Sequence, residues 1–137
     1  NLKAQIRSAS QAMRNANDGV SLIQTAEGGL NEMSNIVIRL RELGIQAASD
    51  TVGETERGFI NTEVQALKQE MDRIAQSTKW GKTNLLDGST PTFDFQVGLN
   101  NSAESDRISF DSSGNVATLS ALGLSGIDFS SKDGASE

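Results

Sequence analysis

Charged side chains at helical spacing are the first candidates for chemistry in this chain. Four glutamates alternate with three cations over 20 residues: Glu54, Glu56, Glu63, Glu70, Arg57, Lys68 and Arg73. A pair of carboxylates across a cleft can perform acid–base catalysis, whereas charges repeated along a helix more commonly contact solvent and one another. We therefore interpret this set as a solvated charged face rather than a catalytic pair.

Other catalytic and metal-binding patterns fail on residue type or spacing. The chain has no Cys and no His, which excludes thiol nucleophiles, imidazole bases and Cys/His zinc sites. The glycine motifs that hold phosphates and dinucleotides are absent, and Asp111–Asn115 lacks the ligand ladder of a calcium loop. Trp80, beside Lys79 and Lys82, is interpreted as a core residue rather than a base-stacking platform. The sequence therefore predicts no enzyme, no cofactor and no metal site.

Charge and composition narrow the class of protein further. The 137 residues carry 12 Lys+Arg against 18 Asp+Glu, a net charge of −6 that repels nucleic-acid phosphates and anionic lipid. Apolar runs stay well below the roughly 20 residues of a membrane span. Hydrophobic residues make up 36% and aromatic residues 4%, so the core must be mainly aliphatic. We expect helix-on-helix packing, with no nucleic-acid or membrane partner.

The elements that position these side chains begin with one long apolar stripe. Its members are spaced alternately by four and three residues, with one phase slip after Ile23: Leu2, Ile6, Ala9, Met13, Ala16, Val20, Ile23, Ala26, Leu30, Met33, Val37, Leu40, Gly44 and Ala47. This predicts a helix over 1–48, roughly 70 Å long, with a break at Gly28 as the alternative. Apolar residues spread beyond the stripe from Ile36 to Ile45, which indicates two packing partners there.

A second helix is predicted over 54–77, with Thr51 and Glu54 as a capping box or Asp50 as the cap. Its stripe is again spaced by four and three: Ile60, Val64, Leu67, Met71 and Ile74. We expect it to lie antiparallel on the end of the first helix, with Leu67 and Ile74 near Leu40 and Met33.

The rest of the chain has a different character, because residues 88–137 contain 2 Lys+Arg against 7 Asp+Glu. Residues 79–88 are predicted to form an irregular crossing anchored by Trp80 and Leu85-Leu86. Strict alternation then predicts a β-hairpin over 92–111, whose inward side chains are Phe93, Phe95, Val97, Leu99, Ile108 and Phe110. Residues 112–137 are expected to be coil, anchored by Leu122 and Leu124.

The second helix is too short to cover the first half of the stripe, from Leu2 to Leu22. We therefore expect another helix or a neighbouring molecule to pack there. The fold class expected is mainly α: an elongated antiparallel helical rod with a small β-hairpin and an irregular C-terminal coil, in one domain over 1–137.

Several ordered motifs resemble the N-terminal conserved region of bacterial flagellin. They are Arg14-Asn15-Ala16-Asn17-Asp18-Gly19, Thr25-Ala26-Glu27-Gly28-Gly29-Leu30, Arg39-Leu40-Arg41-Glu42-Leu43, Gln46-Ala47-Ala48, Glu70 to Gln76, Asn84 to Gly88 and Phe95-Gln96-Val97-Gly98. The resemblance covers essentially residues 1–110. It implies a rod-domain piece truncated at both ends, with a long C-terminal helix to be expected beyond the coil.

The resemblance also implies a function, a location and partners. The function is that of a structural subunit of the extracellular bacterial flagellar filament, acting in motility through packing between subunits. The partners are other flagellin subunits, the flagellar export machinery and the vertebrate Toll-like receptor for flagellin. A hook–filament junction protein is the alternative, and an enzyme or adhesin is a more distant one.

The resemblance places the contact site for the receptor, or for neighbouring protofilaments, on four residues: Arg39, Leu43, Gln46 and Glu63. Arg39 and Leu43 are four residues apart and hence on one helical face. Arg39 has the profile of an interface hot spot, because its guanidinium pairs with carboxylates and its stem covers apolar surface.

Overall fold

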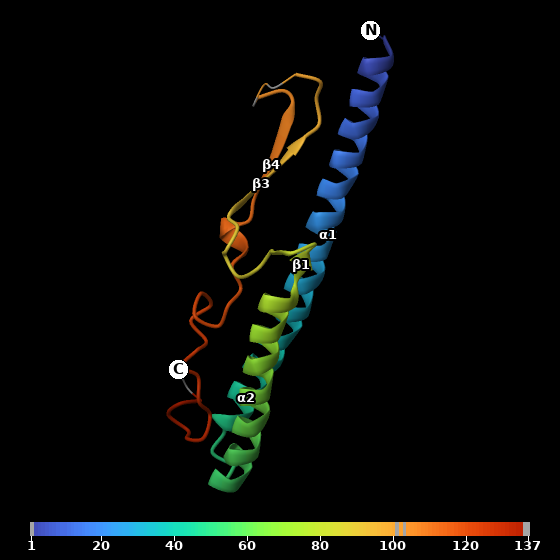
Figure 1. Ribbon diagram of the computed structural model, residues 1–137. Coiled ribbons are helices and arrows are strands. Elements are labelled where there is room, and N and C mark those ends of the chain that lie inside the picture. The colour runs from blue at the N-terminus through green and yellow to red at the C-terminus, as the bar shows by residue number, and fades with distance from the viewer. Residues whose placement is uncertain (1, 101, 103, 136–137) are drawn as a thin grey trace.

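The computed structural model describes residues 2–100, 102 and 104–135, which form an elongated rod (Figure 1). Its elements are α1 (Leu2–Ala47), α2 (Glu54–Ser77), β1 (Lys79–Trp80), β2 (Thr83–Asn84), β3 (Thr92–Gln96), β4 (Arg107–Asp111) and the 3-10 helix η1 (Ser113–Asn115). Parts of three expected elements lie outside the described residues, namely residues 1, 101, 103, 136 and 137. The expected fold class is confirmed: a mainly helical rod with a small antiparallel hairpin.

The first helix is continuous over 46 residues, so Gly28 does not break it. Gly28 faces open space, whereas Gly29 is buried against the chain that leaves α2. A Cβ on Gly29 would lie 2.6 Å from Thr78 Oγ1 and 2.9 Å from Leu86 Cδ1. The glycine pair therefore marks a close crossing of α1 by residues 78–86, which only a residue without a side chain permits.

The second helix, of 24 residues, runs antiparallel to the C-terminal half of α1 (Figure 1). Its stripe lies against α1, and the packing divides into two core clusters. Ile74 belongs to the cluster that contains Met33, and Leu67 packs at the edge of the cluster that contains Leu40. The predicted pairing of the two stripes is confirmed, although Leu67 is only partly buried.

The predicted capping of α2 is wrong. The N-cap is Gly53, which has no side chain to accept a hydrogen bond from the first turn. Thr51 bonds instead to the Ser49 hydroxyl, and Asp50 pairs with Lys132. Glu54 and Glu56 lie in the first turn, where their negative charges interact favourably with the positive end of the helix dipole and stabilise α2.

Two small antiparallel sheets follow α2. β1 and β2 form a two-residue pair in place of the expected irregular crossing, and Leu85 and Leu86 beyond it are 2% and 0% exposed. β3 and β4 pair with Phe93 opposite Phe110 and lie beside the N-terminal half of α1 (Figure 1).

The hairpin strands are shorter than the alternation predicted. β3 ends at Gln96 because the Val97 and Gly98 amides both donate to the Asp106 carbonyl, which is the pattern of a bulge. The strand pairing stops there, so Leu99 is 54% exposed rather than inward. Ile108 lies opposite Phe95 on the face toward α1, but it is also 54% exposed.

The coil after η1 returns along the rod to the turn between α1 and α2 (Figure 1). Leu124 is partly buried, but the predicted anchor Leu122 is 42% exposed. The residues that anchor this coil are instead Ala117 and Phe129, which are 4% and 7% exposed and belong to the two core clusters.

Candidate functional site

An exposed ion-pair cluster joins α1 to α2 at the predicted contact site. Arg39 Nε donates to Glu63 Oε1 at 2.8 Å, and Arg39 Nη1 donates to Glu42 Oε2 at 3.1 Å. The antiparallel packing of the helices brings Arg39 and Glu63 together across 24 residues of sequence. The hydrogen bonds that Arg39 donates, first to Glu63 and then to Glu42, raise the pKa of Arg39 above its ordinary value.

Three of the four predicted contact residues lie at the surface. Arg39, Gln46 and Glu63 are exposed, but Leu43 is only 1% exposed. Residues four apart share a helix face only approximately, and here Leu43 falls on the side of α1 that faces the core. Leu43 belongs to the cluster that also holds Val64 and Phe129, so a partner cannot touch it in this arrangement.

The predicted solvated face of α2 is wrong for two of its cations. Arg57 and Lys68 are 9% and 8% exposed, and both donate to backbone carbonyl groups. The sequence held the signal for this, because Arg57 and Lys68 continue the three-and-four spacing of the buried Ile60, Val64 and Met71. A charged residue on a core stripe must find polar partners there, since a buried unpaired charge is costly.

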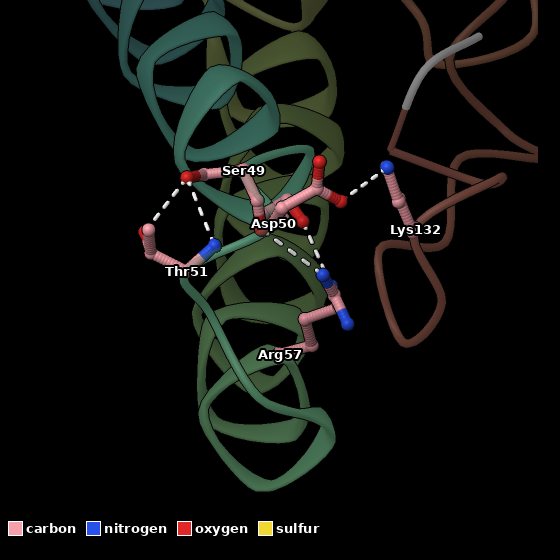
Figure 2. Close-up of polar contacts among 6 residues, drawn as sticks. Ser49, Asp50, Thr51, Arg57 and Lys132 are labelled. Atoms are coloured by element: carbon pink, nitrogen blue, oxygen red, sulfur yellow. Dashed lines mark hydrogen bonds and ion pairs between the residues drawn. The ribbon is translucent and has the colours of Figure 1, made fainter.

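Arg57 closes the C-terminal end of α1. Its Nε donates to the Ala47 carbonyl at 2.8 Å, and its Nη2 donates to the Ser49 carbonyl at 3.1 Å (Figure 2). The last carbonyls of a helix lack partners within the helix and carry partial negative charge, so a guanidinium there is favourable. The side chain from α2 thus fixes the turn that positions both helices of the site.

Phe59 is an exposed aromatic side chain that the sequence analysis did not single out. It is 72% exposed and lies four residues before Glu63, hence on the same face of α2. The sequence offered a signal, because Phe59 does not share the three-and-four spacing of the buried residues Ile60, Val64 and Met71. Together with Arg39 and Gln46, Phe59 and Glu63 form the surface that we call the contact face.

A second exposed surface is the stripe on the N-terminal half of α1. Its large side chains are exposed to between 44% and 71%: Leu2, Ile6, Met13, Val20 and Ile23. The hairpin covers the adjacent face instead, where Ala12, Gly19 and Leu22 are buried. Between the two lies an apolar cavity of about 130 Å³, lined by Ala16, Gly19, Val20, Ile23, Phe95, Ile108 and Phe110.

The chemistry available at these surfaces is that of contact between macromolecules. Within the described part of the chain, no three His, Cys, Asp or Glu side chains gather as a metal-binding group. None of the helices described here has both the length and the apolar character required to cross a membrane. The notable features are instead a long apolar stripe and a charged face with one aromatic side chain.

Comparison with known proteins identifies relatives of this chain. Residues 1–90 match the family described as "Bacterial flagellin N-terminal helical region". Flagellin D of Vibrio cholerae is 45% identical over 100 residues, and flagellin of Halalkalibacterium halodurans is 44% identical over 99 residues. These alignments cover 73% and 72% of this chain, but only 26% and 36% of the two relatives.

Solved structures show the same fold. The crystal structure of Bacillus cereus flagellin matches 90% of this chain with a TM-score of 0.75 at 27% identity, over 69% of that chain. The structure of FliC from Burkholderia pseudomallei matches 73% of this chain with a TM-score of 0.65 at 34% identity, over 37% of that chain.

Proposed function

Because the chain belongs to the bacterial flagellin family through its N-terminal helical region, we propose that it is part of the rod of a structural subunit of the extracellular flagellar filament. The observation that carries this proposal is the exposed stripe from Leu2 to Ile23 on a helix about 70 Å long. Contiguous apolar surface of this extent marks a protein–protein interface.

In this proposal the chain acts by packing. The rods of neighbouring subunits bury the stripe against one another, and the continuous α1 transmits force along each rod without a joint. The relatives reported above are flagellins, and nothing in them favours the alternative of a hook–filament junction protein. They are members of a structural family, which agrees with a function that involves no catalysis.

Charge placed on the stripe tests this function. We would express the full-length protein that contains this sequence in bacteria that lack their own flagellin, and examine cells for filaments and swimming. Met13→Glu adds one negative charge to the stripe, and Gln11→Glu adds one to an exposed position on another face of α1. We expect filaments from the parent and from Gln11→Glu but few or none from Met13→Glu. Normal filaments from Met13→Glu would refute the role of the stripe.

We also propose that the contact face is recognised by the vertebrate Toll-like receptor for flagellin, as the family resemblance implies. Arg39 and Glu63 form an exposed ion pair between two helices, with side chains 48% and 44% exposed. Such pairs add little to stability, so their charges remain available to a partner. Phe59 adds an exposed aromatic side chain beside them, and aromatic and arginine residues are the commonest interface hot spots.

Binding of the receptor ectodomain to immobilised protein tests this second proposal. Arg39→Ala is expected to weaken binding by roughly tenfold or more, the loss typical of a hot spot. Arg41→Ala is the matched control, because Arg41 is exposed on the same helix but points away from the contact face. Equal affinity of the parent chain and Arg39→Ala would remove Arg39 from the site.

A further inference from the structure

Three aspartate–glycine pairs occur in this chain, at residues 18–19, 87–88 and 133–134. In such a pair the glycine amide nitrogen can attack Cγ of the aspartate, because glycine has no Cβ to hinder the approach. A Cγ–N bond forms, the amide proton and the carboxyl OH leave as water, and a succinimide ring results. Water then opens the ring, and opening at the backbone carbonyl leaves isoaspartate. The three pairs share this reactivity, so their surroundings decide which of them reacts.

The first pair is held inside α1. Asp18 and Gly19 lie within the continuous helix, where each amide donates to the carbonyl four residues earlier. Gly19 is also buried against the hairpin, since a Cβ there would lie 3.4 Å from Phe95 Cδ2. The attacking nitrogen is therefore occupied and enclosed, and reaction at Asp18 requires part of the helix to unfold.

The second pair has its carboxyl group bound. Asp87 Oδ1 accepts from the Ser89 amide at 2.9 Å and from the Ser89 hydroxyl at 2.7 Å, and Oδ2 accepts from Asn84 Nδ2. The hydrogen bonds from Ser89, and to a lesser extent the one from Asn84, lower the pKa of Asp87. An ionised carboxylate held toward Ser89 is a poor target for the Gly88 amide, so Asp87 is protected as well.

The third pair has neither form of protection. Asp133 is exposed, and no donor among the described residues bonds to its carboxylate. The Gly134 amide donates to the Ser131 hydroxyl at the surface, at 3.2 Å. The Ala135 amide closes the turn and is shared between the Ser131 and Lys132 carbonyls, each at 3.2 Å. A single turn with a few long, accessible hydrogen bonds opens far more readily than the interior of a long helix.

We propose that Asp133 is a site of spontaneous modification, at which the chain converts to isoaspartate while Asp18 and Asp87 persist. Isoaspartate adds one carbon atom to the backbone between Lys132 and Gly134. The unmodified backbone is folded tightly here, because a Cβ on Gly134 would lie 2.3 Å from the Asp128 carbonyl oxygen. The product therefore disturbs the turn next to Lys132, whose ammonium pairs with Asp50 at the end of the rod (Figure 2). The inference does not depend on the proposed function.

Ageing of the purified protein at neutral pH and physiological temperature tests this site. We would digest samples with a protease that cuts before aspartate but not before isoaspartate. Three short peptides, each with one pair and its native neighbours, give the rates without the fold. In the protein, Asp133 should convert within roughly tenfold of its peptide, whereas Asp18 and Asp87 should be slowed by roughly a hundredfold or more, since their reaction requires local unfolding or release of the carboxylate.

Methyl transfer by an isoaspartyl methyltransferase gives a second readout. Asp133→Glu keeps the charge but would need a six-membered ring, and it should lose nearly all methyl incorporation. Asp18→Glu makes the same change at an exposed position of α1 and should leave incorporation unchanged. Equal rates at Asp87 and Asp133 in the protein, or an Asp133 rate a hundredfold below that of its peptide, would overturn the proposal. So would undiminished incorporation in Asp133→Glu, because the modified residue would then lie elsewhere.

Discussion

The C-terminal half of α1 packs against α2 and against residues 124–135, which we call the strap, whereas the N-terminal half has, among the described residues, the hairpin alone beside it. Met33, Leu40 and Leu43 are 1–4% exposed, but Met13 and Val20 on the same helix are 69% and 53% exposed. Both halves carry the same spacing of apolar residues. The difference shows that the periodicity of apolar residues defines an apolar face on α1. The length of α2, which covers part of that face, decides whether each part becomes core or interface.

Two methionines on α1 make the comparison directly measurable, and the largest effect is expected here. Met33→Ala removes a side chain that is 3% exposed and should cost roughly 2–5 kcal/mol of unfolding free energy. Met13→Ala makes the same change in the open half and should alter stability by no more than about 0.5 kcal/mol. Urea denaturation of the two variants checks this. Similar losses would mean that the N-terminal half is also packed in the isolated chain.

The neighbouring glycines at the junction of the two halves should respond in opposite directions. Gly29→Ala places a Cβ against Thr78 and Leu86, and overpacking of this kind typically costs about 1–3 kcal/mol. Gly28→Ala meets open space and should stabilise the helix by up to about 1 kcal/mol, because alanine is the better helix former. Thermal melts of both variants test this sign difference. A stabilising Gly29→Ala would contradict the close crossing.

Removing the buried guanidinium of Arg57 should reduce the free energy of unfolding by a similar or smaller amount. Arg57→Met keeps the apolar stem but leaves the Ala47 and Ser49 carbonyls without their donor, at a cost of about 1–3 kcal/mol. Arg73→Met is the control, because Arg73 is exposed and pairs only with Glu70 one turn away. We expect denaturation to show a clear loss for the first variant and little change for the second.

Removing the ion pair between Asp50 and Lys132 should have the smallest effect on stability, and this effect should depend on pH. The hydrogen bond and charge of Lys132 lower the pKa of Asp50. A carboxyl with a lowered pKa stabilises the folded state above its unfolded pKa of about 4, and this stabilisation is lost as pH falls through the folded value. The melting temperatures of the parent and Asp50→Asn should therefore differ slightly at pH 6 and converge near pH 3. A difference that persists in acid would show that the amide acts through something other than lost charge.

The sequence predicted the helices well because their signal is local. Stripes spaced by three and four residues defined α1 and α2, and the same spacing put Ile74 with Met33. The contact face was predicted only in part. Arg39 and Glu63 came together as the resemblance implied, but Leu43 did not reach the surface.

The failures share a physical cause, which is contact between residues distant in sequence. Arg57 and Lys68 continue the buried spacing of α2, so their burial had a local signal, but no local pattern specifies that their partners would be carbonyl groups of the turn and of residues 124–135. The same holds for the anchor of the coil: Leu122 and Phe129 are both apolar, but only Phe129 packs against Gly44. The widened apolar sector from Ile36 to Ile45 predicted a second partner, but Val37, Ile38 and Ile45 are 41%, 55% and 68% exposed, and Phe129 packs at Gly44 instead.

The turn closed by Arg57 also bears on the order in which the chain folds. The bond from Arg57 to the Ala47 carbonyl spans only 10 residues, whereas those from Lys68 and Asp50 to the strap span 57 to 82. Closing a short loop costs less chain entropy than closing a long one. We therefore expect α1 and α2 to pair, beginning at their turn, before residues 124–135 dock on them. Pulsed hydrogen exchange during refolding should then protect amides around residues 43–64 before those of 124–135. The two helices would thus pack together and stiffen first. For a brief interval, the end of the rod near the α1–α2 turn would still lack its contact with residues 124–135.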